Sequence, residues 1–420
     1  MLSCRAVRIA LLPLDGRPCN ARFPRDLAAI AGHEVRIPPL EILGRYMEPA
    51  SFPRVREWLL DVRRTADLLI VSVDMLCYGG IETSRDGRVS KEEALRRLET
   101  LREIPEARSF SVIMRATVTC HSEETLPLWR AVWEYNVHGR GEIPADVLAE
   151  YRLARERNRA VNLRLLELPV AERLYFQDDA GERGPHVEEA RELARRGARM
   201  MPGADEAGMM MVFRAIGKRA SFQATVLGDR NRVALYEDRS IWHSLAEHAE
   251  YLGCGLEGGI PLTLVAPAPD SVDRFLDPPP PSRRYRMPIR GVLIDCADAN
   301  GADPDLMTSV RISDLDAFAA WNTASNSIGT ALCHGIAGKG DGRFLIERLL
   351  DDWLYQSVVR PELVERCRTD GIDRFQCGER WDAYVDRRLH ELSSPWDIRV
   401  PPFRAFLPWG RLFEVEIEWL

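Results

Sequence analysis

The chain has 420 residues, enough for one barrel-sized domain with an appendage or for two to three smaller domains, and its composition is ordinary for a soluble globular protein. Its formal net charge of -7 and its pI near 5.8 lack the basic footprint of nucleic-acid binding, so we predict no nucleic-acid partner. The nine cysteines are scattered without CxxC pairs or metal-like spacing, which argues against a disulfide framework or a zinc ribbon and favours reduced thiols.

The chain begins with an apolar patch, residues 7–14, which we interpret as the first strand. This patch is too short to cross a membrane, and Asp15 and Arg17 follow it where a signal peptide has small residues. We therefore predict a cytoplasmic protein with no membrane partner.

From this point apolar runs of strand length alternate with amphipathic helical stretches, which is typical of parallel βα units. The predicted strands are Ile9–Leu14, Leu68–Val73, Ser111–Arg115, Arg173–Gln177, Phe222–Leu227, Leu262–Ala266, Val292–Cys296 and Ala317–Trp321. The predicted helices are Pro53–Arg64, Lys91–Glu103, Glu124–Glu134, Ala145–Leu168, Val187–Arg196, Glu206–Lys218 and Ser240–Tyr251.

Polar side chains follow the carboxyl end of nearly every predicted strand. Eight strands with helices between them permit an α/β fold of the TIM (β/α)8 type, while a doubly wound open sheet explains the periodicity almost as well. In a barrel the strand ends converge on one rim, so we favour the barrel, with the short run Glu34–Ile37 outside it or at its edge. About half of these polar residues are expected to be helix caps instead. The residues at the strand ends, taken together, are Asp15, Arg17, Asp74, Arg115, Thr117, Asp178, Asp179, Asp229, Asp295, Asp298, Trp321 and Asn322.

Beyond Gly340 the alternation of strands and helices ends. Three helical stretches, Arg343–Tyr355, Pro361–Cys367 and Trp381–Leu392, precede a strand-like segment, residues 413–419. We therefore predict a barrel over residues 1–340 and a mainly helical C-terminal appendage over residues 341–420 that packs on it.

The acid pair Asp178 and Asp179 is the strongest candidate for catalysis. An apolar run of strand formers stops abruptly at these two carboxylates, and Gly181 follows. Two adjacent carboxylates disfavour each other's ionisation, and such perturbed groups are concentrated at functional sites. The alternative is that one aspartate caps the next helix while the other faces water.

Other strand ends carry groups suited to binding a polar substrate. Arg17 offers a planar fork of donors that Asp15 could hold in place, and the alternative is a purely structural Asp–Arg pair. Asp74 is followed by glycines that allow a ligand to approach the backbone. Trp321 and Asn322 could provide an aromatic face and an amide to a sugar ring, and the alternative for the tryptophan is a position in the core. Arg115 and Asp295 complete the predicted substrate-binding set.

Metal and cofactor signals are weak. The histidines form no HxH or HExxH pattern, so no metal ligands are assigned, although a carboxylate-rich magnesium site stays an alternative. Neither a Walker loop nor a GxGxxG motif follows the first strand, and no cofactor is predicted. Asp205 and Glu206, which open a nearly all-apolar helix, are interpreted as partners of its dipole, with a role in the site as the minority view.

At these motifs the chain resembles a bacterial family catalogued as domain of unknown function 4127. The resemblance spans nearly the whole chain, and the family name implies no activity. Where the family's first motif has a second acid this chain has Gly16, so that position is assigned no role. The resemblance depends on Leu12–Asn20, Asp74–Gly80, Ser84 and Arg85, Gln177–Asp179, Gly203–Glu206, Trp321–Gly329 and Pro408–Arg411.

The predicted architecture also resembles the barrel hexosaminidases that use substrate assistance, in which the fourth strand ends in an adjacent acid pair. An ordinary retaining glycosidase needs its carboxyls about 5–5.5 Å apart across the bond, whereas in these enzymes the 2-acetamido oxygen of the sugar attacks. The resemblance implies that Asp178 orients the acetamido group and that Asp179 is the general acid/base.

These patterns lead to one leading hypothesis and two alternatives. We predict a glycoside hydrolase that releases a terminal N-acetylhexosamine, GlcNAc or GalNAc, by substrate-assisted retention, so that the partner is a small-molecule or glycan substrate. The first alternative is a hydrolase or lyase in which Asp15, Asp74, Asp178 and Asp295 surround magnesium or manganese. The second is a non-catalytic, sugar-binding barrel. The oligomeric state is left open.

Overall fold

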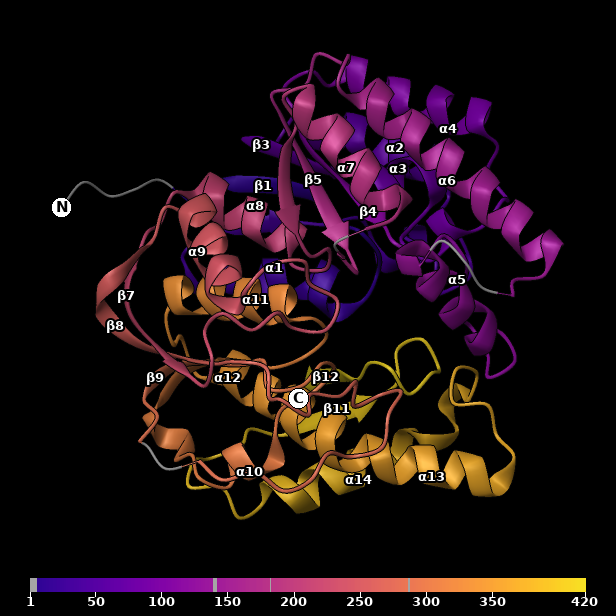
Figure 1. Ribbon diagram of the computed structural model, residues 1–420. Coiled ribbons are helices and arrows are strands. Elements are labelled where there is room, and N and C mark those ends of the chain that lie inside the picture. Colours follow the sequence, from indigo (N-terminus) through magenta and orange to yellow (C-terminus); the bar gives the residue numbers. More distant parts are fainter. Residues whose placement is uncertain (1–5, 139–141, 182, 286–287) are drawn as a thin grey trace. The chain divides into compact units, whose positions relative to one another are not determined.

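A computed structural model of the chain describes residues 6–138, 142–181, 183–285 and 288–420 (Figure 1). The chain divides into two compact units, Met1–Ile216 and Gly217–Leu420. Each unit is built around a parallel β-sheet of its own, and each is described here by itself.

The sheet of the first unit has six parallel strands in the order β2-β1-β3-β4-β5-β6. The chain passes from β1 to β2 on one side and then returns to place β3 on the other side of β1. In open α/β sheets such a reversal creates a crevice at the carboxyl ends of the strands, where ligands bind. The strands are β1 Arg8–Leu12, β2 Glu34–Arg36, β3 Leu68–Ser72, β4 Arg108–Met114, β5 Glu172–Asp178 and β6 Arg199–Pro202.

Helices cover both faces of this sheet, and the two layers are visible in Figure 1. On one face a large apolar core joins the strands to residues of α2, α4, α6 and α7. On the other face α8 packs on β1 and β3, and its Gly208 allows close contact with Leu11 and Phe110. The helices are α1 Pro18–Ile30, α2 Phe52–Val62, α3 Val73–Tyr78, α4 Lys91–Leu98, α5 Leu126–His138, α6 Ala145–Leu165, α7 Pro185–Arg195 and α8 Ala207–Ile216.

The second unit contains a four-stranded parallel sheet in the order β10-β9-β8-β7. Helices α9 and α11 pack against each other and on the sheet, and α12 packs on β10. Side chains of α10 and α12 form a second core with Val265, Leu293 and Phe318. The strands are β7 Ser221–Leu227, β8 Gly255–Val265, β9 Gly291–Asp295 and β10 Leu315–Ala319, and the helices are α9 Ile241–Leu252, α10 Pro304–Met307, α11 Ala324–Ala337 and α12 Arg343–Arg348.

The rest of this unit begins with a π-helical segment, Leu349–Val359, that continues α12. Helix α14 packs on this segment and on β11, and β11 pairs with β12 in an antiparallel hairpin. The remaining elements are α13 Arg360–Asp370, α14 Asp382–Ser393, β11 Phe403–Phe406 and β12 Glu416–Trp419. Short 3-10 turns occur at Leu40–Ile42, Thr83–Arg85, Glu99–Glu103, Ile312–Asp314 and Gly378–Trp381.

The structure confirms the α/β class, the parallel strands and all eight predicted strands. The TIM barrel is wrong, because the described residues place these strands in two separate open sheets. Strand β7 shows how the open sheet differs from a closed barrel. It pairs with β8 along one side and lies at the end of the strand order, and Phe222 is its one buried residue, as expected for an edge strand. The short run at residues 34–37 is likewise an edge strand, β2.

The boundary between the units, after Ile216, falls inside the segment that the sequence predicted as one barrel, residues 1–340. Residues 341–420 belong to the second unit together with β7 to β10. Their attachment is direct, because α12 packs on β10 and the carboxylate of Asp352 accepts the backbone N–H of Ala320 at 2.8 Å.

Candidate functional site

The loop after β1 carries a buried network of ionic hydrogen bonds. Asp15 accepts the backbone N–H and the Nε of Arg17, each at 2.9 Å. Arg17 also binds both carboxylate oxygens of Asp205, at 3.2 and 2.5 Å. The amide of Asn20 bridges the two carboxylates, with 3.0 Å to each. Asp205, which the sequence suggested as a dipole partner of α8, therefore joins β1 to the segment before α8 at the carboxyl edge of the sheet.

The predicted acid pair lies at the carboxyl end of β5. Asp178 is the last residue of the strand, and Asp179 has a left-handed backbone with φ 46°. This conformation ends the strand, so the rule that successive side chains point to opposite faces no longer applies to Asp179. The Asp178 carboxylate lies 3.5 Å from Arg85, whose other terminal nitrogen is 3.2 Å from Glu82. The pair thus meets a charged segment that follows α3.

Burial raises the pKa of Asp178 well above its ordinary value, and the neighbouring Asp179 carboxylate raises it further. Arg85 and Arg17 oppose this rise, while Asp205 adds to it. These influences show that the acid pair and the Asp15–Arg17–Asp205 network share one electrostatic environment. A carboxyl group with a raised pKa at the carboxyl edge of a sheet has the properties of a general acid.

Arg115 and His186 lie near the loop that follows the acid pair. The Arg115 guanidinium stacks on Trp133, 3.3 Å from the ring centroid, and donates to the Trp133 carbonyl at 3.2 Å. A Cβ added to Gly181 would lie 3.4 Å from this guanidinium and 3.7 Å from Nε2 of His186. His186 is fully buried, and burial lowers its pKa to about 3, so the ring is neutral. Arg115 therefore has a polar neighbour that the sequence patterns missed.

Asp74 has a different environment from the one predicted. It lies in the first turn of the short helix α3, is buried, and accepts the backbone N–H of Val112 in β4 at 2.9 Å. Burial is the main cause that raises its pKa to about 7. Its carboxyl group therefore ties α3 to the sheet, which is the role of a structural group.

Replacing Asp74 by asparagine is expected to remove part of the pH dependence of stability. Because the folded pKa, about 7, exceeds the ordinary 3.8, folding of the wild type takes up a proton between these values. The free energy of unfolding then falls as pH rises through that range. The variant lacks this loss, so its stability relative to wild type should improve by about 2–3 kcal/mol from pH 5 to pH 8.

Urea unfolding at the two pH values measures this change. Asp61→Asn is the matched control, because Asp61 is exposed on α2 and lies 3.8 Å from Arg64. If Asp74→Asn differs from wild type by the same free energy at both pH values, the raised pKa is wrong.

The three remaining predicted residues lie in the second unit, where Asp295 ends β9 and Trp321 and Asn322 follow β10. Asp295 is buried and accepts the backbone N–H groups of Ala297 and Asp303, and burial raises its pKa to about 7. Trp321 is buried against Phe413, with ring centroids 5.6 Å apart. Asn322 has φ 67°, and its carbonyl accepts from Asn300 at 2.9 Å. These contacts hold the loops at this edge of the sheet in place.

The predicted site residues are thus divided between the two units. Asp15, Arg17, Asp178 and Asp179 meet in the first unit, while Asp295, Trp321 and Asn322 belong to the second. Within the described ranges, no group of three or more His, Cys, Asp or Glu residues is placed to hold a metal ion.

Sequence reasoning missed several members of the first network. Asp205 was assigned to the helix dipole, and Asn20, Glu82 and His186 were given no role. Arg85 was recognised within a motif but was not included in the site. Asn20 and Asp205 also lay within the motifs Leu12–Asn20 and Gly203–Glu206, so their membership of these motifs was the signal that could have found them.

Comparison with known proteins adds the family but no activity. No curated protein and no solved structure matches the chain. None of the helices in the described part has the length and apolar character needed to span a membrane. The sequence model of a family described as "Protein of unknown function (DUF4127)" matches residues 9–418, and the chain therefore belongs to this family.

Proposed function

We propose that the protein is a glycoside hydrolase in which Asp178 donates the proton to the leaving group. The observation that carries the proposal is the pair of adjacent carboxyl groups at the end of β5, where only 15% of the Asp178 side chain is exposed, and the raised pKa of Asp178 supports it. Cleavage of a glycosidic bond needs a carboxylic acid that stays protonated near the working pH and a second carboxyl group that stabilises the oxocarbenium-like transition state. Asp178 and Asp179 supply two such groups at one strand end.

The proposal exchanges the roles that the hexosaminidase resemblance implied. Burial and the Asp179 charge both keep the proton on Asp178, so Asp178 is the acid and Asp179 the orienting carboxylate. The barrel comparison itself no longer supports the assignment, because Asp178 ends β5 of an open sheet. The substrate-assisted route is retained because the two acids are adjacent, whereas direct attack would need a carboxylate on the opposite side of the bond.

A panel of 4-nitrophenyl glycosides tests the proposal with the intact chain. GlcNAc, GalNAc, glucose and galactose derivatives are compared, each with and without EDTA. We expect release of nitrophenol from the 2-acetamido sugars alone, and no effect of EDTA. Turnover that EDTA abolishes and magnesium or manganese restores would support the metal-dependent alternative. Binding of a sugar without turnover would support the non-catalytic one.

The pH dependence of kcat/KM provides a second test of the same assignment. The active form carries the proton on Asp178, so activity should fall as pH rises above the raised pKa of this group. A profile without an alkaline limb would contradict the role of Asp178 as a general acid.

A further inference from the structure

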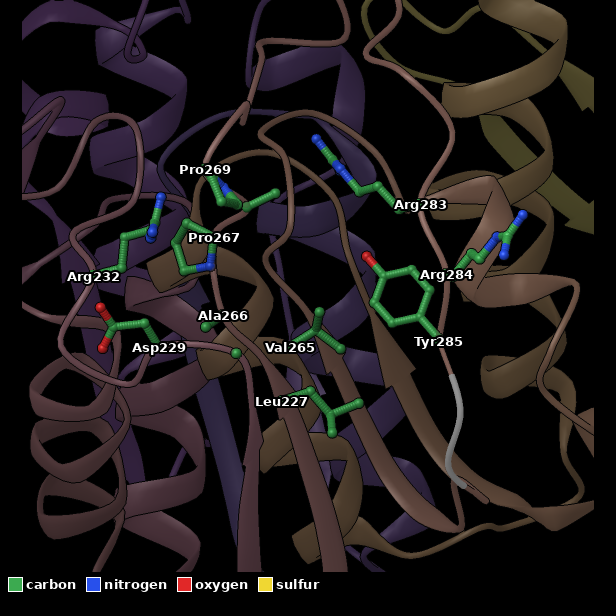
Figure 2. A pocket seen from close by; sticks show the side chains of 12 residues that line it. Leu227, Asp229, Arg232, Val265, Ala266, Pro267, Pro269, Arg283, Arg284 and Tyr285 are labelled. Atoms are coloured by element: carbon green, nitrogen blue, oxygen red, sulfur yellow. The ribbon is translucent and has the colours of Figure 1, made fainter.

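A cavity of about 510 Å³ opens at the carboxyl ends of β7 and β8 in the second unit (Figure 2). This volume lies within the range of about 300–1,000 Å³ that is typical of small-molecule sites. Leu227 and Val265 contribute apolar side chains from the two strand ends. In Figure 2, Arg232 and Asp229 lie on one side of these residues and Arg283 and Tyr285 on the other.

Arg232 is the central feature of the cavity. Its side chain is half-buried, and its guanidinium forms no hydrogen bond or ion pair with any described residue. The backbone around it is well held, since its N–H donates to the Asp229 carbonyl and its carbonyl accepts the N–H of Ile241 at the start of α9. A partly desolvated cation on a fixed backbone is prepared for an anionic partner.

The opposite wall contains arginines of two kinds. Arg283 is already paired with the buried carboxylates of Asp298 and Asp303, at 2.8 and 2.9 Å, and Tyr285 donates to Asp303 at 2.8 Å. Arg284 is exposed and has no ion pair within the described ranges. Among the carboxylates only Asp229 lines the cavity, against three arginines. The lining therefore favours a negatively charged ligand.

The segment Pro267–Pro269 of the cavity wall offers no free backbone donor to an anion. Residues Pro267 and Pro269 have no N–H, and the N–H of Ala268 between them already donates to the carbonyl of Ala297 at 3.1 Å. Along this wall, recognition of an anion therefore depends on the guanidinium groups. The remaining lining is apolar, with the ring of Tyr285 facing the strand ends in Figure 2.

From these features we infer a second ligand site at Arg232 that binds a small organic anion, with one carboxylate or phosphate group on a flat, partly apolar body. Arg232 holds the anionic group, and Leu227, Val265 and Tyr285 contact the body. The inference does not depend on the role of Asp178, because every residue that forms the cavity belongs to the second unit.

Isothermal titration of the full chain with four probes tests this inference. Phenyl phosphate and benzoate carry the two anionic groups on an aromatic ring, inorganic phosphate lacks the ring, and benzamide lacks the charge. We expect saturable binding of at least one aryl anion, with inorganic phosphate and benzamide weaker by about tenfold or more. The tighter of the two aryl anions identifies the anionic group.

Two variants separate the contribution of charge from that of shape. Arg232→Gln should weaken binding of the aryl anion by about tenfold or more, whereas Arg290→Gln should not, since Arg290 is exposed before the amino end of β9. Ala268→Phe should fill the cavity and abolish binding, with Ala268→Ser as its control. Thermal unfolding of the unliganded variants checks that they are folded.

Three results would overturn the site. They are the absence of saturable binding of both aryl anions to wild type, equal affinity of wild type and Arg232→Gln, and binding of inorganic phosphate as tight as that of phenyl phosphate.

Discussion

Replacing Asp178 by asparagine is expected to lower kcat for glycosides with poor leaving groups by a factor of about 10²–10⁴. Asparagine has nearly the shape of the acid but cannot donate its proton to the leaving oxygen. Activated 4-nitrophenyl glycosides need little protonation of the leaving group, so they should lose far less activity. The measurement is the ratio of rates on alkyl and nitrophenyl glycosides for wild type and variant.

The surroundings of Asp178 make this variant suitable. Arg85 keeps Glu82 as a partner at 3.2 Å when the carboxylate is removed, so no buried cation is left alone. Asp179→Asn is the informative comparison, because loss of an orienting carboxylate should slow both classes of substrate. Asp61→Asn on the surface of α2 serves as the neutral control. Equal losses on both substrate classes for Asp178→Asn would remove its role as the acid.

The variant Arg85→Gln tests the protonation of Asp178 in a second, independent way. The Arg85 guanidinium lowers the pKa of Asp178, and its removal should therefore move the alkaline limb of the pH profile to higher pH. A purely structural role of Arg85 would reduce activity without moving this limb.

Replacing Arg348 by methionine is expected to lower the free energy of unfolding of the second unit by about 3–5 kcal/mol. Arg348 is fully buried and contacts three carboxylates within about one turn of the chain, at 2.7 Å for Asp352 and at 3.2 Å for Asp351 and Glu347. Methionine has a similar length but no charge, so the three acids lose this cation in a desolvated site. The loss should be larger at pH 8 than at pH 5, since protonation relieves the repulsion.

Hydrogen exchange of peptides from β10 and from the π-helical segment, measured along a urea titration, reports on this unit. Arg368→Met is the matched control. Its arginine also pairs with a glutamate, Glu365, but lies on the surface of α13 with 74% of its side chain exposed, so its loss should cost under about 1 kcal/mol. Adding Asp352→Asn to Arg348→Met should recover part of the stability. A loss for Arg348→Met no larger than that of the control would contradict the buried network.

Local patterns predicted most elements because strands and amphipathic helices have characteristic spacings of apolar residues. Helix α11 was missed for the opposite reason: all of its residues are buried, so it has no solvent-exposed face of charged residues to reveal it. Helix α1 contains Pro18 and Pro24, which local rules take as breaks, although proline is compatible with the first turn. Strand β6 has four residues and ends in Pro202, which is too short for a clear pattern.

The candidate site was only partly predictable for a related reason. Asp178 could be identified because an apolar strand stops at an acid pair, and this feature is local. The contact of Arg17 with Asp205 joins residues 188 positions apart, and no short-range pattern contains that distance. Asp74 resembled a binding residue in its motif, but its carboxylate is used by the backbone N–H of Val112.

What the sequence alone determined is the α/β class, the parallel strands and the concentration of polar residues at their carboxyl ends, because these follow from the spacing of apolar residues. The tertiary structure decided how many sheets the strands form, which acids meet and where burial raises the pKa of an acid. Strand pairing between distant segments decides whether a set of βα units closes or stays open, and burial decides the pKa of Asp178. Both depend on contacts between residues far apart in the chain, which local spacing does not contain.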